Sequence, residues 1–519
     1  MVSGDQSSPL KNLSHDLPAS IVVFLVALPL CLGVALASGA PLFSGIIAGV
    51  VGGIVVGLLS GSALSVSGPA AGLTTIVLAS ISSMGSFEAF LVAVFLAGVF
   101  QLVLGFLQAG GIGNYFPAAV IKGMLAAIGV ILILKQIPHA LGYDHDFEGD
   151  ESFFQQDGEN TFTELSHAIS FINPGAVVIC LLSLLILVIW DKPFMKRLGV
   201  IAKVPAPLLV VIAGLIMNGL FKFTDSSWQI NAEHLVSLPV SENVSAFAGH
   251  FRMPDFTAIL TRECWIVAFT IAIVASLESL LSIEAVDKLD PFKRTSPLNL
   301  ELKAQGVANM LSGLIGGLPI TAVIVRSTAN IASGARTKTS SIVHGLLLLL
   351  TVFFIPGLLN KIPLASLAAI LLVVGYKLAA PSLIKGMYRK GMDQFIPFML
   401  TVVAILLTDL LIGICIGILV GLFFVLKTNF RQSIISVNED GNYLIRLTKD
   451  VTFLNKALLR RTLREIPEGS RVIIDGTRPA FIDQDIIETI TDFRASAPNR
   501  RIKVELKQSV TAYNPIFKT

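Results

Sequence analysis

Apolar runs long enough to cross a membrane recur through the first 428 positions, with short polar breaks between them. A transmembrane helix needs roughly 20 consecutive, mostly apolar residues. The pattern predicts fourteen such segments: Pro18–Ala37, Phe43–Leu59, Leu64–Ile81, Phe87–Leu107, Phe116–Ile137, Pro174–Trp190, Pro205–Phe221, Trp265–Ile283, Leu302–Ile315, Leu318–Ala332, Ser341–Ile355, Leu364–Tyr376, Phe395–Leu407 and Leu411–Leu426. Several are short, and the last two can also be read as one broken hairpin. The predicted fold class is a polytopic α-helical membrane protein of 14 segments.

Charged residues in the loops support this count. Basic residues follow the sixth, eighth, tenth and twelfth segments: Lys192, Lys196, Arg197, Lys203, Lys288, Lys293, Arg294, Lys303, Arg336, Lys338, Lys377, Lys385, Arg389 and Lys390. The loop after the fifth segment is acidic instead: Asp144, Asp146, Glu148, Asp150, Glu151, Asp157, Glu159 and Glu164. Because Lys and Arg favour the cytoplasmic side, one orientation satisfies the whole set. It places the chain in the inner (plasma) membrane with both termini in the cytoplasm.

Fourteen segments divide into two sets of seven, about 18–221 and about 262–428. A repeat with an odd number of spans must insert upside down when it is duplicated in tandem. Inverted repeats are typical of secondary transporters, and a matched pair of Gly/Pro-interrupted segments marks their binding sites. Ser67–Thr75 in the third segment and Gly316–Ala322 in the tenth form such a pair. The alternative is that Gly and Pro are simply frequent in membrane helices.

Two half-helices that begin inside the membrane would point their free N–H groups and positive dipole ends at an anion. Proline is tolerated in a first helical turn because its missing N–H would be unpaired there, and threonine hydroxyls add donors. The predicted anion-binding residues are Ala70, Ala71, Thr74, Thr75, Ile320, Thr321, Ala322 and Arg326.

Arg326 and Glu278 are charges inside predicted segments, where a charge costs roughly 2.5–3.5 kcal/mol. Arg326 follows Pro319 by seven residues, about two helical turns, so we expect it to share a face with the start of its segment. The alternative is that Arg326 extends towards the nearby membrane surface. Glu278 has three candidate roles: a partner for Arg326, a proton acceptor, or a sodium ligand together with Ser282 and Thr74. Carboxylate and hydroxyl oxygens suit a hard cation, so sodium is the one candidate cofactor.

The composition excludes several classes of protein. Apolar residues make up 54% of the 519 positions and charged residues 14%, against about 25% charged in an average soluble domain. A mean hydropathy of +0.78 argues against a soluble enzyme, a disordered chain and a disulfide scaffold. A net charge of +3 is too small to indicate nucleic-acid binding. The sequence shows no nucleophile–base pair, metal cluster or phosphate loop, so we expect no enzyme activity.

The C-terminal tail has the composition of a soluble domain, since more than a third of the charged residues lie after Leu426. Residues 443–447, 451–453, 471–475 and 502–506 are predicted strands, and residues 455–464 and 483–493 predicted helices, the second capped by Asp483. Strands that alternate with helices predict a small α/β domain. The predicted domains are thus a cytoplasmic N-terminus (1–17), a transport domain (18–428) and a cytoplasmic domain (429–519).

These motifs together resemble the SulP family of inorganic anion transporters (solute carrier family 26), in a bacterial form. The matching stretches are Asp16–Ala19, Ser67–Pro69, Ala275–Ser282, Gly316–Pro319 and Val325–Ser327, and the tail resembles the STAS domain of that family. The resemblance implies core and gate domains, an elevator-like movement and a homodimer. It implies substrates such as bicarbonate, sulfate, chloride or dicarboxylates.

In sodium-dependent bicarbonate members, an acid followed four residues later by a hydroxyl residue binds the ion. Glu278 and Ser282 have that spacing, although the acid there is Asp. The stretch after Glu278 also resembles members associated with a carbonic anhydrase. In the tail, Phe481–Ile486 replaces the usual Asp-Ser-Ser-Gly, so a dimerisation or docking role is expected rather than phosphorylation.

The sequence therefore predicts a secondary active transporter of bicarbonate with sodium coupling. The first alternative is a proton-coupled transporter of sulfate, chloride or a dicarboxylate. A nucleobase permease would share the segment breaks but would not need Arg326. An anion channel and a non-transporting sensor remain as alternatives of another class.

Overall fold

The structure is a computed structural model in which the chain forms two compact units, Met1–Ile418 and Leu419–Thr519. It describes residues 12–144, 160–190, 192, 195, 204–224, 228–238, 249–431, 433–439, 441–479 and 481–508. Parts of the sequence predictions fall outside these residues: most of the N-terminal segment 1–17, most of the acidic loop, Lys196, Arg197, Lys203 and the last eleven residues.

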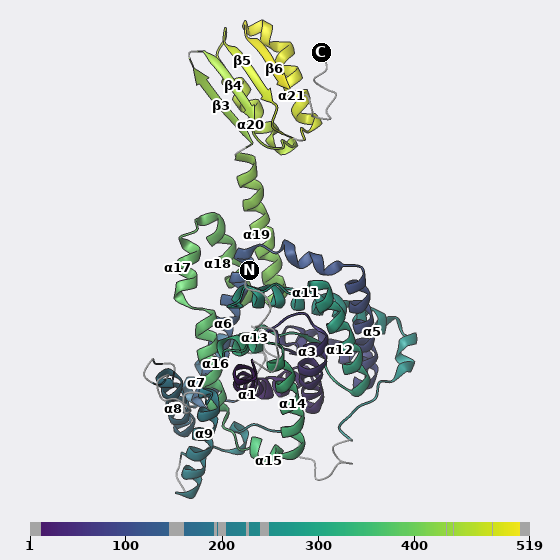
Figure 1. The fold of residues 1–519 in the computed structure, drawn as a ribbon, viewed down its shortest axis with the longest axis vertical. Helices are drawn as coiled ribbons and strands as arrows, with labels where there is room; N and C mark the ends of the chain where they lie inside the picture. Colours follow the sequence, from purple (N-terminus) through teal and green to yellow (C-terminus); the bar gives the residue numbers. More distant parts are fainter. Residues whose placement is uncertain are drawn as a thin grey trace. The chain divides into compact units, whose positions relative to one another are not determined.

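All fourteen predicted segments contain helix (Figure 1). They correspond in order to α1 (Leu13–Ala37); α2 (Leu42–Val51) with η2 (Gly52–Val56) and α3 (Gly57–Leu59); β1 (Ser67–Pro69) with η3 (Ala71–Leu73) and α4 (Thr74–Met84); α5 (Phe87–Phe106); α6 (Ala118–Leu141); α8 (Pro174–Trp190); α9 (Ala206–Phe223); α11 (Arg262–Leu289); α12 (Leu298–Ile315); β2 (Ile320–Ala322) with α13 (Ile324–Ala332); α14 (Thr339–Phe354); α16 (Leu364–Leu378); α18 (Met392–Leu407); and α19 (Leu410–Arg431).

Not every segment is long enough to span a bilayer as one straight helix. Among the described residues, seven helices have the length and apolarity to cross a membrane, and an eighth span results if α7 (Thr161–Ser170) and α8, bent by 112°, count as one. Four further apolar helices are shorter, and α12 and α13 fall outside both groups. The remaining short elements of this unit are η4 (Ala109–Tyr115), η7 (Ala232–His234), η8 (Phe256–Leu260), α15 (Pro356–Leu359) and α17 (Pro381–Tyr388).

The helices pack in pairs that exchange between the two halves of the chain. Each segment of the first half can be matched with the segment seven places later, so that α5 matches α14, and α2 with η2 matches α12. Helix α5 packs on α12, and its match α14 packs on α2 and η2, so the same contact occurs twice. In the same way α1 packs on α14 and α11 packs on α5, while α6 packs on its own counterpart, α16. This exchange is what two copies of one seven-segment unit produce.

A second group of helices surrounds α6 and α16. Helix α8 packs on α16 and α9, and α18 packs on α6. Ile179, Phe221 and Ala369 belong to an apolar cluster of this group, separate from the main core. We call α6, α8, α9, α16 and α18 the gate group, and α1, α2, α4, α5 and α11–α14 the core group.

The C-terminal unit is a small α/β fold with its own apolar core. Its sheet has the order β3 (Ile434–Glu439), β4 (Asn442–Leu447), β5 (Arg471–Gly476), β6 (Lys503–Gln508), and Figure 1 shows these strands side by side. The pair β3–β4 is antiparallel, and the other two pairs are parallel. The two predicted helices are α20 (Lys456–Arg464) and α21 (Gln484–Ser496), and Asp483 caps α21.

Two details of the predicted tail are wrong. The predicted strand 451–453 is only an isolated bridge between Val451 and Ile482, because a 3₁₀ turn, η9 (Phe453–Asn455), starts directly after it. Strand β3 was not predicted. It is an exposed edge strand with one buried residue, Ile434, so it lacks the apolar alternation that marks a half-buried strand.

Candidate functional site

The third and tenth segments meet as a two-stranded antiparallel ribbon, β1–β2. Ser67 lies opposite Ala322, Gly68 opposite Thr321, and Pro69 opposite Ile320. Both broken segments therefore come together, as their matched positions suggest. The predicted proline role is wrong, however, because Pro69 lies within β1 and α13 begins only at Ile324, five residues after Pro319.

Side chains from three helices hold the outer edge of this ribbon. The Asn309 amide accepts the Ile320 N–H at 2.6 Å and donates to the Ile320 carbonyl at 2.9 Å. The Ser279 hydroxyl accepts the Ala322 N–H at 3.2 Å, and the Ser327 hydroxyl accepts the Val66 N–H at 3.0 Å. These bonds satisfy backbone groups that would otherwise be costly to bury.

Arg326 lies against the ribbon at Gly68. A Cβ on Gly68 would stand 2.0 Å from Nη1 of Arg326, so only glycine leaves room for the guanidinium there. Cross-strand partners share a face, so the side chain of Thr321 lies on the same face of the ribbon. The seven-residue helical spacing that predicted a shared face is wrong, because residues 320–322 are extended.

This face of the ribbon carries buried donors that lack acceptors. Arg326 is 1% exposed and Thr321 is fully buried. Among the described residues, Nε and Nη1 of Arg326 and the Thr321 hydroxyl have no hydrogen-bond partner, and neither has His344, a buried neighbour on α14. A buried cation without a partner is expensive, so this arrangement fits an anion.

The helix of the third segment, α4, begins with a 3₁₀ turn rather than directly after a strand. Ala70 is buried, Ala71 starts the 3₁₀ turn η3, and Thr75 is exposed. Thr74 is 3% exposed, and its hydroxyl donates to the Ala71 carbonyl at 2.9 Å. Its hydrogen is thus used locally, while its oxygen can still accept a hydrogen bond or contact a cation.

Glu278 lies beside this first half-helix. A Cβ on Gly72 would stand 3.3 Å from Oε1 and 3.4 Å from Oε2 of Glu278. The next residue, Ser279, holds β2, so α11 touches both broken segments at adjacent positions. Ser282 lies one helical turn further and is 4% exposed. The Glu278 carboxylate therefore borders the predicted anion site, and Ser282 and Thr74 offer further oxygens of the type that sodium prefers.

The sequence analysis overlooked a third charged residue, Glu301 on α12. It is fully buried and accepts hydrogen bonds from the Ser60 hydroxyl and from the Gln305 amide at 2.8 Å. Gln305 also donates to the Ser67 hydroxyl in β1 at 2.8 Å. Glu301, Gln305 and Asn309 recur at every fourth position, and this polar stripe on an apolar helix was the signal that could have identified them.

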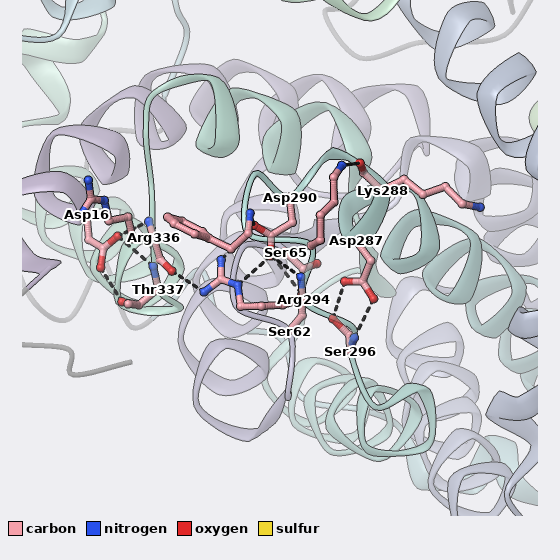
Figure 2. Close-up of polar contacts among 12 residues, drawn as sticks. Asp16, Ser62, Ser65, Asp287, Lys288, Asp290, Arg294, Ser296, Arg336 and Thr337 are labelled. Carbon is pink, nitrogen blue, oxygen red and sulfur yellow. Dashed lines mark hydrogen bonds and ion pairs between the residues drawn. The ribbon is translucent and has the colours of Figure 1, made fainter. Parts of the chain in front are cut away.

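Loops that the charge pattern assigns to one side meet in a polar network (Figure 2). Asp16 at the start of α1 accepts the N–H groups of Arg336 and Thr337 at 2.7 and 3.1 Å. Arg294 bridges the Arg336 carbonyl at 2.8 Å and the Asp290 carboxylate at 2.7 Å. The start of α1 and the loops after the eighth and tenth segments therefore lie at one end of the core group.

A cavity of about 520 Å³ lies between the core and gate groups. Pro18 and Val22 of α1 and Ala329, Ala332, Ser333 and Gly334 around the end of α13 form one wall, and residues of α8, α9 and α16 form the other, including Lys377. None of the predicted anion-binding residues lines it. It opens beside α13, whose first turn carries Arg326.

Several known proteins resemble this chain. The profile of the sulfate permease family matches residues 13–404. YvdB of Bacillus subtilis (strain 168), whose name describes it as a candidate sulfate transporter, is 32% identical over 422 residues, which cover 80% of this chain and 74% of YvdB. The bicarbonate transporter BicA of Picosynechococcus is 26% identical over 449 residues, which cover 84% of this chain and 75% of BicA.

Solved structures agree with these sequence matches. The transmembrane domain of a cyanobacterial bicarbonate transporter, BicA, matches with a TM-score of 0.54 at 25% identity, covering 79% of this chain and 98% of that domain. The structure of SLC26A9 matches with a TM-score of 0.66 at 16% identity, covering 98% of this chain and 86% of the other. The second likeness shows a shared fold.

Proposed function

Because this chain belongs to the sulfate permease family, a family of multi-pass membrane transporters rather than enzymes, we propose that it is a secondary active transporter of bicarbonate. Sulfate is the second candidate, since the relatives described above include proteins named for each anion. The observation that carries the proposal is the buried Arg326 guanidinium, which has two nitrogens without a hydrogen-bond partner beside the β1–β2 ribbon. A neutral nucleobase would not compensate this charge.

We further propose that the two charged groups have separate roles. The anion is held by Arg326, Thr321 and the two neighbouring segments, Ala70–Thr75, which leads into α4, and Ile320–Ala322, which forms β2 before α13. Glu278 and Ser282, with Thr74, bind the co-transported cation, and sodium is the first choice. Since the carboxylate borders the anion site at Gly72, a bound cation and the anion would stabilise each other. In the alternative, proton-coupled mechanism, Glu278 itself carries the proton.

Movement of the core group against the gate group would provide alternating access. The cavity of about 520 Å³ separates these groups at the end where Pro18 and Lys377 lie, which the charge pattern assigns to the cytoplasm. An elevator-like shift of the core group would carry the anion site past the gate group. The cavity then corresponds to an inward-facing state.

The proposed transport function also suggests a membrane location, an oligomeric state and a partner for the protein. We propose an inner (plasma) membrane location with both termini cytoplasmic, a homodimer, and a docking or dimerisation role for the C-terminal unit. A carbonic anhydrase, which interconverts bicarbonate and carbon dioxide, is the proposed enzymatic partner.

Uptake by purified protein in liposomes tests the function directly. Labelled bicarbonate and labelled sulfate are offered separately, with and without an inward sodium gradient. We expect bicarbonate uptake that the sodium gradient stimulates. Sulfate uptake driven by external acid would support the proton-coupled alternative. Flux that follows only the anion's own gradient and the membrane potential would indicate a channel, and binding without flux would indicate a sensor.

A further inference from the structure

One carboxylate joins two histidines at the end of α6. Asp144 Oδ1 lies 2.5 Å from Nδ1 of His139, and its Oδ2 lies 2.5 Å from Nδ1 of His234. The three side chains are between 3% and 14% exposed. His139 belongs to the last turn of α6, whereas His234 lies in η7, in the long connection between the two repeats. The charge pattern assigns this end to the non-cytoplasmic side.

The residues directly after His234 are bonded to the turn before α16, which belongs to the gate group. Leu235 bridges Pro363, the Val236 N–H donates to the Ile362 carbonyl at 3.0 Å, and Leu238 exchanges two hydrogen bonds with Asn360 at 2.7 and 3.0 Å. These bonds tie the segment that follows His234 to the turn before α16.

Further along, the same connection is attached to the core group. The ring of Phe251 packs edge-on against Phe43 of α2, with centroids 5.5 Å apart. The Asp255 N–H donates to the Glu88 carbonyl of α5 at 3.0 Å. The connection is therefore bonded to the gate group through residues 235–238 and to the core group through Phe251 and Asp255.

Protonation sets the strength of the gate attachment. An ionised Asp144 between two neutral imidazoles leaves a buried negative charge, and one imidazolium cancels it. A hydrogen bond between ionised groups is roughly twice as strong as a neutral one. A second imidazolium would repel the first, so one proton suffices to close the cluster.

The surroundings shift the pKa values of Asp144 and His234 in the directions that favour an ion pair. Burial opposes the ionised form of Asp144, but the hydrogen bonds from His139 and His234 outweigh it, and the pKa of Asp144 lies below its usual value. The hydrogen bond to Asp144 raises the pKa of His234, against the effect of burial and with help from Glu233. A further charged pair joins α6 to α7: Lys135 Nζ lies 3.4 Å from Oε2 of Glu164.

These directions define the pH window. The stabilisation that protonated His234 contributes is fully present below about pH 6.5, the ordinary imidazole pKa, and it is lost as the pH rises through the raised pKa. The contribution of Asp144 is present above its ordinary pKa of about 3.9 and is lost only in stronger acid. The attachment is therefore closed in mild acid and weakens in alkali.

We propose that Asp144, His139 and His234 form a proton-binding regulatory site on the non-cytoplasmic side. The protonated site holds the inter-repeat connection to the gate group, and loss of the proton at alkaline external pH releases it and speeds transport. This proposal goes beyond the proposed anion transport and takes from it the elevator movement and the membrane orientation.

Hydrogen exchange of the full-length protein tests the attachment without reference to any substrate. After correction for intrinsic exchange, the amides of residues 230–238 should exchange faster at pH 8.5 than at pH 6, because the raised pKa of His234 links loss of its proton to opening of the attachment. In H234A they should exchange rapidly at both pH values. H167A, which changes an exposed histidine on α7, should behave as wild type. Equal wild-type protection at both pH values would overturn the proposal.

Uptake of labelled sulfate at fixed internal pH and varied external pH tests the consequence for transport. Wild-type uptake should be slower at external pH 6 than at pH 8.5, whereas H234A should be fast at both. H234Q, which keeps a donor but cannot titrate, should also have a flat profile and guards against loss of folding in H234A. A wild-type pH profile in both variants would contradict the proposal. If no anion is carried, the proposed function fails, and the exchange experiment still decides on the regulatory site.

Discussion

The two broken segments occupy equivalent places in the repeat but begin their helices in different surroundings. At α4, Gly72 and Thr75 are exposed and the carboxylate of Glu278 lies alongside. At α13, the whole stretch from Ile324 to Asn330 is buried, and it carries Arg326. The duplicated backbone gives both sites a positive helix start, whereas the side chains differ in charge. We infer that the α13 side provides affinity for the anion and the α4 side provides coupling to the cation.

Removal of the Arg326 charge is expected to have the largest effect. A hydrogen bond to a charged group contributes about 1.5–3 kcal/mol, so R326M should lower kcat/KM for the anion by about tenfold to a hundredfold. Stability should not fall, because the variant replaces an unpartnered buried charge with an apolar chain of similar length. Uptake kinetics and thermal unfolding measure the two effects, with R252Q at a half-exposed arginine as the control. A large loss of stability in R326M would indicate a structural role instead.

Alanine substitutions at Gly68 and Gly72 compare how much the α13 side and the α4 side contribute to anion affinity. In G68A the added Cβ would stand 2.0 Å from Arg326 Nη1, and in G72A it would stand 3.3 Å from Glu278 Oε1. Overpacking at a buried site costs about 1–3 kcal/mol, so G68A should raise the KM for the anion by about tenfold. G72A should change this KM by less than about twofold, since the contact needs only a small adjustment. Equal effects in the two variants would contradict the assignment of affinity to the α13 side.

Neutralisation of Glu278 should affect coupling rather than affinity. E278Q keeps the shape of the side chain but removes the charge that attracts a cation. We expect stimulation by the cation gradient to fall by about fivefold, roughly 1 kcal/mol, while anion binding without the gradient is retained. E284Q, at a partly exposed residue on the same helix, is the control. A normal gradient response in E278Q would remove this residue from the coupling mechanism.

The smallest expected effect is that of the Ser282 hydroxyl. S282A should weaken cation activation by about twofold, since one neutral oxygen contributes about 0.5 kcal/mol. The half-saturating sodium concentration for uptake measures this change. If sodium dependence is unaltered in S282A but lost in E278Q, the carboxylate acts without the serine.

The sequence predicted the segments well because membrane helices depend on local apolarity. All fourteen predicted ranges overlap helices, and the charge pattern grouped loops that the network of Asp16 and Arg294 brings together. Local apolarity could not predict the ribbon, because Gly68 and Thr321 are far apart in the chain. Their pairing gives residues 320–322 an extended conformation, whereas the helical spacing had placed them on a helix. Arg326 therefore lies beside the ribbon at Gly68, although the helical spacing that placed it near the start of its segment was wrong.

Polar residues within helices were the least predictable part of the site. Asn309 and Ser279 hold the ribbon, and Glu301 with Gln305 supports it from α12. Glu301, Gln305 and Asn309 share a four-residue spacing, but neither this spacing nor Ser279 alone reveals the distant residues that they contact. The Asp144 cluster likewise depends on contacts between α6 and the inter-repeat connection, which no local pattern reveals.

Anion binding to Arg326 is the central claim, and ligand-dependent thermal unfolding tests it without requiring transport. A ligand that binds the folded state raises the free energy of unfolding by RT ln(1 + [L]/Kd). Bicarbonate and sulfate are titrated against purified wild type and R326M in detergent, with ionic strength held constant. The account predicts a rise in wild-type Tm with at least one of these anions and no rise in R326M. An equal rise in both proteins would show that the anion binds elsewhere.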